Sequence, residues 1–278
     1  MTTICEASIN TFYEINKKKD NDNANKIREE IIFSLLQKTI PSKWYKNEKW
    51  NNLKLELFQS IGLNGIDIHN YTIEKKGGRN YNYDFIIDTK KIEFKYNSTK
   101  IDKCPQFLSI SSNNFCKDNG YASFFYDNYI HKIAKLLTLE VPNKADYLKY
   151  VYNNNYDKLA FFRELKLNEH LIKKEKNKIV KESIGEYLHK HLILDIENLN
   201  KILVNKEDNK YYLLYKNGCF NFDKINKNEL EIIEIKEIKN NNTLILTTKS
   251  NTKISMLLRW KNHIGILYPA WQIGLINR

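Results

Sequence analysis

The sequence lacks long apolar runs and clustered cysteines. No apolar stretch approaches the roughly 18 residues that a membrane-spanning helix requires, and the start of the chain has no charged and apolar segments of a secretory signal peptide. The four cysteines form no C-x-x-C pair, and no histidine stands at zinc-ligand spacing. We therefore expect a soluble, intracellular protein with reduced thiols, cytoplasmic or, in a eukaryotic host, nuclear, and without a membrane partner.

Arginine is also scarce, since it accounts for five of the 45 basic residues and the rest are lysines. The formal net charge is nevertheless +12 and the pI is about 9.2, a balance that favours a polyanionic partner such as nucleic acid. Abundant lysine, asparagine, isoleucine and tyrosine are also typical of an A/T-rich genome, so the charge alone does not decide the partner. A chain of 278 residues is long enough for one large or two smaller domains.

The segment 83–96 is the most informative motif, because it predicts a tight β-hairpin. With a two-residue turn at Thr89-Lys90, Asp84 lies opposite Lys95. Side chains alternate along a strand and cross-strand partners share a face, so Asp84, Glu93 and Lys95 come together on one face. A slip of one residue would destroy this arrangement. The opposite face then carries only apolar residues, namely Phe85, Ile87, Ile92 and Phe94.

Two neighbouring carboxylates and an ammonium group predict metal-assisted chemistry. The carboxylates repel each other, and a hard divalent cation such as Mg2+ is a suitable counter-charge because it prefers oxygen ligands. Lys95 could orient or help to deprotonate a water molecule, or neutralise charge that develops on a phosphate. These groups suit the hydrolysis of a phosphodiester with Mg2+, for which Mn2+ can substitute. The alternative is a surface hairpin whose polar face is merely solvated.

The motif resembles that of the PD-(D/E)XK nuclease superfamily, which includes many restriction endonucleases and Holliday-junction resolvases. Asp84 matches the first acid and Glu93-Phe94-Lys95 matches E-x-K, whereas Tyr83 stands in place of the proline. The resemblance implies that Asp84 and Glu93 hold the metal together with the backbone carbonyl of Phe94, and that Lys95 positions or activates water. It implies an α/β (α+β) fold, with a restriction-endonuclease-like mixed sheet flanked by helices and followed by a C-terminal β-rich region.

The resemblance covers about residues 24–126 and implies a helix before the catalytic strands, with a glutamate that reaches the metal site. The sequence predicts a helix over 24–40, followed by Pro41. Glu29 lies nearest the edge of its apolar arc and is therefore the first candidate for this accessory acid. Glu30 on the same helix and Glu56 on a second predicted helix over 48–61 are alternatives. A solvated glutamate favoured by the helix dipole is the other interpretation.

The remaining candidates contact substrate or DNA. The resemblance implies a glutamine soon after E-x-K that touches substrate or a metal-bound water, and Gln106 starts the strand predicted next. A basic, glycine-containing loop (75–80) precedes the catalytic strand and carries groups that bind phosphate, although it could equally be an ordinary connection between strands. The last predicted hairpin (254–273) carries groups that read base edges, and the alternative is an ordinary hairpin with two buried tryptophans. The candidate DNA-binding residues are Lys76, Arg79, Arg259, Lys261, Asn262 and Gln272.

Periodicity divides the chain into four regions and leads to a functional hypothesis. We expect a Mg2+-dependent, sequence-specific endonuclease of type II restriction type that acts on double-stranded DNA, with a homodimer as a further expected assembly. A structure-specific repair or recombination nuclease, and a non-catalytic DNA-binding protein on the same fold, are alternatives. The expected regions are an N-terminal segment (1–23), the catalytic core (24–142), a helical connector (143–204) and a β-rich DNA-recognition region (205–278).

Overall fold

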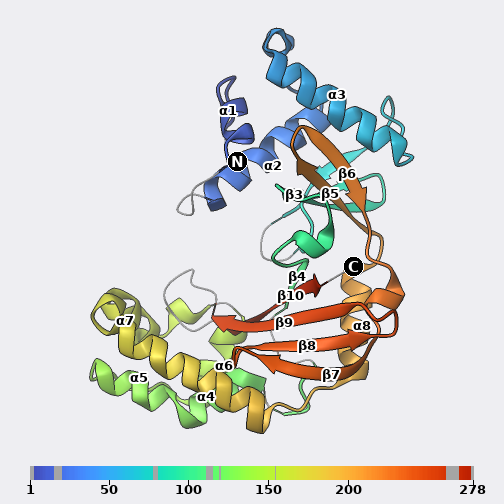
Figure 1. Cartoon of the computed structure of the whole chain (residues 1–278). Coiled ribbons are helices and arrows are strands. Elements are labelled where there is room, and N and C mark those ends of the chain that lie inside the picture. Colours follow the sequence, from blue (N-terminus) through green and yellow to red (C-terminus); the bar gives the residue numbers. More distant parts are fainter. Residues whose placement is uncertain are drawn as a thin grey trace. The chain divides into compact units, whose positions relative to one another are not determined.

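The chain forms two compact units, each built from two separate stretches of sequence. The computed structural model describes residues 3–15, 21–77, 81–110, 115–118, 120–153, 155–260 and 269–276. Each unit contains a five-stranded β-sheet with accompanying helices, so the fold is mixed α+β (Figure 1). Unit 1 comprises Met1–Cys104 and Lys206–Asn226, and unit 2 comprises Pro105–Asn205 and Lys227–Arg278.

The helices of unit 1 confirm the two that the sequence predicts. In α3, the side chain of Asn47 caps the first turn by accepting the backbone N–H of Lys49 at 3.0 Å. The stripe of Trp50, Leu53 and Leu57 on α3 is fully buried, as its spacing of three and four residues requires. The elements are α1 (Ser8–Tyr13), α2 (Asn21–Leu36), the 3-10 turn η1 (Ser42–Lys46) and α3 (Glu48–Leu63).

The sheet of unit 1 is mixed and has the strand order β1-β2-β3-β5-β6. Neighbouring strands are antiparallel except for β3 and β5, which are parallel. Because a parallel pair cannot be joined by a tight turn, the chain makes a long excursion through unit 2 between these two strands. The strands are β1 (Ile73–Lys75), β2 (Phe85–Ile87), β3 (Lys90–Tyr96), β5 (Lys210–Lys216) and β6 (Cys219–Asp223).

The hairpin of β2 and β3 forms, but the turn predicted at Thr89-Lys90 is wrong by one position. Phe85 pairs with Ile92, and the turn is Asp88-Thr89. Asp88 adopts a φ of 52°, which aspartate tolerates better than most residues, and its carboxylate accepts the backbone N–H of Thr72 at 2.9 Å. The cross-strand register therefore differs by two residues from the prediction. A shift of two keeps every strand residue on its expected face, so the apolar residues Phe85, Ile87, Ile92 and Phe94 lie in the core.

The apolar face of this hairpin packs against α2. Phe33 of α2 stacks on Phe85 with ring centroids 5.9 Å apart. Arg28, also on α2, is buried with its guanidinium 3.7 Å from the ring centre of Tyr96 and donates to the backbone carbonyl of Phe12 at 3.3 Å. These contacts fix the hairpin to the helix, so that its polar residues point away from the core.

Among its described residues, unit 2 combines an antiparallel sheet of order β4-β10-β9-β8-β7 with the five α-helices α4 to α8. Helices α4 and α5 are separated by the single residue Tyr129. Within the described ranges, no helix has the length and apolar character required to cross a membrane. The helices are α4 (Gly120–Asn128), α5 (Ile130–Leu136), α6 (Lys144–Tyr152), α7 (Ala160–Glu186) and α8 (Ile196–Glu207). The strands are β4 (Leu108–Ile110), β7 (Ile232–Lys239), β8 (Thr243–Thr248), β9 (Lys253–Trp260) and β10 (Pro269–Ile276).

The observed units divide the chain differently from the four expected regions, since residues 105–142 of the expected catalytic core belong to unit 2. Strands β5 and β6 form a hairpin with its turn at Asn217-Gly218, and they complete the sheet of unit 1 rather than belonging to a separate region at 205–278. Conversely, β4 pairs with β10 in unit 2 and does not continue the sheet that contains β3. Both differences arise from pairing between strands far apart in sequence, which local alternation does not reveal.

We predict that Phe85→Ala destabilises the protein strongly. The side chain is fully buried between α2 and the sheet, so its removal leaves a cavity and should lower the free energy of unfolding by about 3–5 kcal/mol. Urea denaturation followed by circular dichroism measures this difference. The control is Leu63→Ala at an 80% exposed position, where a change within about 0.5 kcal/mol is expected. Equal effects of the two substitutions would contradict the assigned core.

Candidate active site

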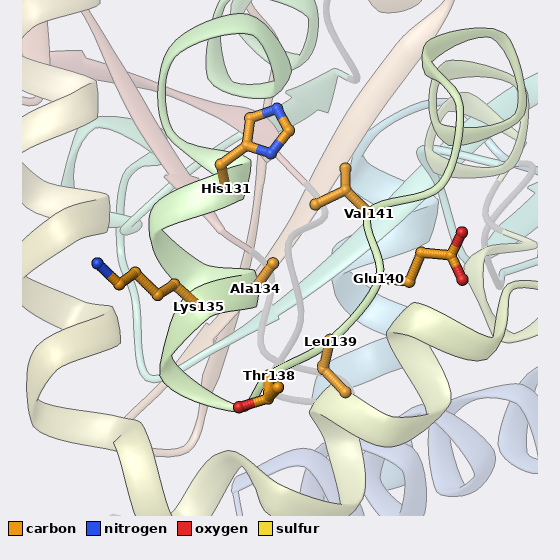
Figure 2. Close-up of a pocket in the computed structure, with 7 residues that line it drawn as sticks. All are labelled: His131, Ala134, Lys135, Thr138, Leu139, Glu140 and Val141. Atoms are coloured by element: carbon orange, nitrogen blue, oxygen red, sulfur yellow. The ribbon is translucent and has the colours of Figure 1, made fainter.

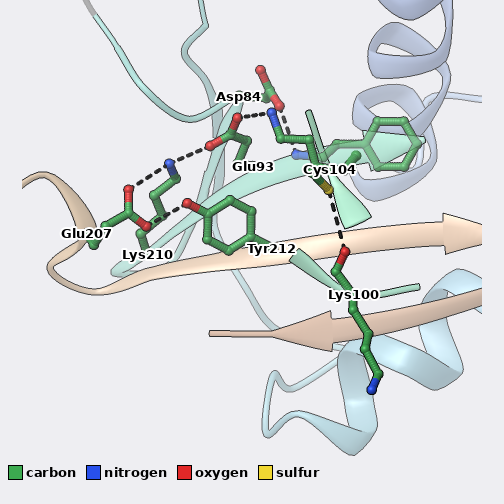
Figure 3. A network of polar contacts seen from close by, with 9 residues as sticks. Asp84, Glu93, Lys100, Cys104, Glu207, Lys210 and Tyr212 are labelled. Carbon is green, nitrogen blue, oxygen red and sulfur yellow. Dashed lines mark hydrogen bonds and ion pairs between the residues drawn. The ribbon is translucent and has the colours of Figure 1, made fainter. Parts of the chain in front are cut away.

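The structure brings Asp84, Glu93 and Lys95 together beside the start of β2. Figure 3 shows Asp84 beside Glu93. Glu93 and Lys95 are alternate residues of β3 and therefore share one face. Asp84 directly precedes β2 and donates its backbone N–H to the carbonyl of Ile92 at 2.8 Å. Its carboxylate oxygen Oδ2 accepts the backbone N–H of Phe94 at 2.8 Å. The Asp84 side chain thus ends the hydrogen-bond ladder and is held close to Glu93.

The backbone of Phe94 adds a further oxygen to this side of β3. In a strand, the N–H and C=O groups of one residue point toward the same neighbouring strand. Because the N–H of Phe94 reaches the Asp84 carboxylate, the Phe94 carbonyl faces the same side. This orientation is the one that the predicted role of the carbonyl as a metal ligand requires.

Glu93 belongs to a continuous row of polar contacts, which we call the ion-pair row (Figure 3). Its oxygen Oε1 forms an ion pair with Lys95, and its oxygen Oε2 forms one with Lys210. The ammonium of Lys210 also lies 3.1 Å from Oε1 of Glu207. The hydroxyl of Tyr212 donates to Oε2 of Glu207 at 2.6 Å. The row therefore runs from Lys95 through Glu93 and Lys210 to Glu207 and Tyr212.

Sequence reasoning missed Lys210, Glu207 and Tyr212. The parallel register places Tyr212 beside Glu93 and Lys210 beside Lys91, on the same face of the sheet. Two local features of the sequence point to these residues. Glu207 and Lys210 are three residues apart, and Lys210 and Tyr212 are two residues apart, which puts both on one face of a strand. Neither feature identifies Glu93 as the partner, because that contact depends on the pairing of β3 with β5.

The exposure of the side chains falls along the row. The side chain of Lys95 is 22% exposed and that of Glu93 is 14% exposed, whereas Glu207 is 2% exposed and Lys210 is 0% exposed. Solvent or a ligand therefore reaches the row at the end formed by Lys95 and the neighbouring Asp84. A reaction at this site would take place at that end.

Burial and charge shift the pKa of the two groups at the open end. Burial raises the pKa of Asp84 to about 6, and the negative charge of Glu93 adds to this rise. The Phe94 N–H, Lys95 and Lys210 act in the opposite direction but do not cancel it. For Lys95, burial lowers the pKa, yet the attraction of Glu93 and Asp84 outweighs burial and raises it. Lys95 is consequently an ammonium ion at neutral pH.

The buried end of the row carries a further acid and a protonated phenol. Burial raises the pKa of Glu207, although Lys210 and the Tyr212 hydrogen bond oppose this effect. Burial and the charge of Glu207 raise the pKa of Tyr212, which therefore remains a hydrogen-bond donor. With all groups ionised, three carboxylates face two ammonium groups. The site as a whole has an excess of negative charge.

This donor set fits a hard cation in its chemistry. Carboxylate and carbonyl oxygens are the ligands that Mg2+ prefers, and an extra cation would compensate the charge that raises the pKa of Asp84. The described residues contain no group of three or more His, Cys, Asp or Glu side chains arranged for a metal ion. A metal at this site would therefore depend on Asp84, Glu93 and the Phe94 carbonyl, with water completing its coordination.

The accessory acid remains a prediction. Glu30 is buried and forms an ion pair with Lys75, which is in register with Phe85 on the core side of the sheet. The pKa of Tyr13 is raised mainly by burial and, to a smaller extent, by the negative charge of Glu56. Glu56 therefore lies near Tyr13. Glu29 is half-buried on α2.

The predicted DNA contacts are distributed over both units. Arg259 on β9 donates to the side-chain oxygen of Gln272 on β10 at 3.2 Å. Lys76 forms an ion pair with Glu74. Gln106 precedes β4 in unit 2, so it does not stand on the strand next to β3 as expected. The candidates Arg79, Lys261 and Asn262 lie outside the described residues.

A separate cavity of about 630 Å³ lies beside the end of α5 in unit 2 (Figure 2). None of the candidate residues lines it. Its lining residues are His131, Ala134, Lys135, Thr138, Leu139, Glu140 and Val141.

Comparisons with protein-family models, with curated proteins and with solved structures found no match to this chain. The assignment of a function therefore rests on the residues of the site.

We predict that Asp84→Asn stabilises the protein at neutral pH but not at acidic pH. The pKa of Asp84 is raised in the folded protein from 3.8 to about 6, so the folded state binds this proton more tightly than the unfolded chain does. Ionised Asp84 therefore costs stability above pH 6, and the cost disappears as the pH falls toward 4. The expected gain at neutral pH is of order 1–3 kcal/mol.

Thermal unfolding from about pH 4 to pH 8 measures this gain, with Asp88→Asn in the exposed turn of the same hairpin as control. A gain for Asp84→Asn that is the same at both ends of the range would contradict the raised pKa.

Proposed function

We propose that this protein is a divalent-metal-dependent nuclease that hydrolyses phosphodiester bonds of DNA. The observation that carries the proposal is the meeting of Asp84, Glu93 and Lys95 at the accessible end of a largely buried ion-pair row. Two acids and an ammonium ion at a solvent-accessible position supply the groups that such a hydrolysis requires. Sequence-specific cleavage of the type II restriction kind is the finer hypothesis.

Asp84 and Glu93 would hold Mg2+ or Mn2+ together with the Phe94 carbonyl. When bound, the metal would polarise the phosphate and lower the pKa of a water molecule. The hydrogen bond from the Phe94 N–H orients the Asp84 carboxylate for this purpose. Glu93 would exchange its contact with Lys95 for the metal while retaining Lys210. The restriction-endonuclease-like fold is supported by the mixed sheet with α2 packed on its apolar face.

Lys95 acts as a cation in this proposal. In the metal-free site its pKa is raised because the attraction of Glu93 and Asp84 outweighs the opposing effect of burial, so Lys95 is an ammonium ion there. An ammonium ion can contact a phosphate oxygen and stabilise the charge that develops during the reaction. We therefore propose that Lys95 acts by electrostatic stabilisation and positioning.

DNA as the substrate is supported by the charge of the chain. A net charge of +12 favours binding to the phosphate backbone, which is largely electrostatic. Arg259 and Gln272, joined across β9 and β10, provide groups that hydrogen-bond base edges. A second protomer would account for cleavage of both strands.

A non-catalytic DNA-binding protein is the second candidate function. One observation favours it, because both carboxylate oxygens of Glu93 are already engaged by lysines. In that case the ion-pair row would serve only the stability of the sheet. The difference between the two functions lies in whether Lys95 leaves Glu93 when a metal is added.

We predict that supercoiled plasmid DNA is cleaved with Mg2+ or Mn2+, and that Asp84→Asn and Lys95→Met each reduce the rate at least about 100-fold. The first removes a metal ligand and the second removes the cation. Asp88→Asn and Lys90→Met make the same chemical changes elsewhere in the hairpin and should retain cleavage.

Discrete fragments of duplex DNA would support a sequence-specific restriction endonuclease. Cleavage of branched DNA alone would support a structure-specific repair or recombination nuclease. DNA binding without cleavage in either metal would establish the non-catalytic alternative.

We also predict that Mg2+ lowers the pKa of Asp84 from its raised value of about 6. A bound cation stabilises the carboxylate, so the midpoint should fall by at least about one pH unit. Carboxyl 13C NMR of Asp84, titrated with and without Mg2+, measures the shift. K+ at the same ionic strength is the control, and an unchanged midpoint with Mg2+ would place the metal elsewhere.

A further inference from the structure

The side chain of Lys210 is completely buried, although it carries a charge. Its ammonium lies between Oε2 of Glu93 and Oε1 of Glu207, the latter at 3.1 Å. The hydroxyl of Tyr212 holds the other oxygen of Glu207 at 2.6 Å. A buried charge is tolerated only when it is paired and hydrogen-bonded, so Lys210 has little freedom to move.

The two lysines that contact Glu93 differ in their surroundings. Lys95 is 22% exposed and follows Glu93 by two residues on the same strand, so its ammonium can reach another anion without unfolding. The side chain of Lys210 is 0% exposed and reaches Glu93 from the neighbouring strand β5. Breaking its contacts would leave buried carboxylates uncompensated, which is strongly unfavourable. Lys210 is therefore a fixed partner of Glu93, and Lys95 is an exchangeable one.

We propose that Lys210 is a positioning residue that holds the Glu93 carboxylate in one orientation from the buried side of the sheet. Lys95, in contrast, releases Glu93, so that Glu93 can bind the metal and Lys95 can contact a phosphate. Glu207 and Tyr212 orient Lys210 in turn. The inference rests on the proposed nuclease function for the reaction that it assigns to Glu93. The claim that Lys210 fixes the orientation of Glu93 does not depend on which reaction the protein catalyses.

The alternative role of Lys210 is to neutralise Glu207 alone. A double variant separates the two roles. Lys210→Met/Glu207→Gln removes one positive and one negative charge together, so the net charge of the row is unchanged. The amide at position 207 also keeps an acceptor for the Tyr212 hydroxyl. Lys95→Met removes the other lysine and provides the matched comparison.

Three measurements on these variants test the proposal. Thermal unfolding reports whether the double variant is folded, side-chain NMR or a crystal structure reports the orientation of Glu93, and plasmid cleavage reports the rate. In the double variant we expect a folded protein with a lower melting temperature, because Glu93 loses its buried lysine partner. We also expect a Glu93 side chain that samples several rotamers and cleavage reduced about 10–100-fold. In Lys95→Met, Glu93 should keep its orientation although cleavage is lost.

Glu93 fixed in its original orientation in a folded double variant, with wild-type cleavage, would overturn the proposal. If the double variant does not fold, Tyr212→Phe removes only the hydroxyl that orients Glu207, and it should broaden the Glu93 rotamers and slow cleavage several-fold. Unchanged Glu93 rotamers in Tyr212→Phe would then overturn it. Absence of cleavage by the wild-type protein would contradict the proposed nuclease function, whereas the Glu93 orientation would still decide the role of Lys210.

Discussion

The parallel pairing of β3 with β5 is the contact on which the arrangement of unit 1 depends. It joins two stretches of the chain that are separated by the first segment of unit 2. It covers one edge of the β2–β3 hairpin, which would otherwise expose unpaired backbone groups. It also brings Lys210 to Glu93, so a residue from the other stretch compensates part of the negative charge on the polar face of β3.

The electrostatics of the row follow from this pairing. A carboxylate that is 14% exposed, as Glu93 is, needs positive charge nearby, and two lysines supply it from different directions. Asp84 has less compensation, since its hydrogen bond from the Phe94 N–H does not offset burial and the charge of Glu93. The negative charge is thus least balanced at the end that solvent reaches. This gradient favours a cation at the open end.

Much of the local structure could be predicted from the sequence. The apolar stripe of α3 and the alternation in β2 and β3 each identify an element and its buried face, because these patterns depend on neighbouring residues. The faces of Glu93 and Lys95 followed from alternation alone. The turn did not, because the left-handed conformation of Asp88 is supported by Thr72, which is distant in sequence.

The composition of the units and the buried half of the row could not be predicted in this way. The run of apolar and aromatic residues in β5 indicates a strand but does not identify its neighbour, so the sequence predicts the wrong region for it. Lys210 has the same appearance in the sequence as the many solvated lysines of this basic chain. Only the three-dimensional pairing distinguishes it from them.

The insertion of the first segment of unit 2 between β3 and β5 also affects how the protein is made. During synthesis on a ribosome, β3 emerges well before β5. The edge of β3 that pairs with β5 therefore stays unpaired while residues 105–205 are translated. The same delay leaves Glu93 without Lys210. Unit 2 in turn needs β7 to β10, which follow β5 and β6. Neither unit can complete its sheet before the other has largely been synthesised, so the two units become complete late and within a short interval of each other.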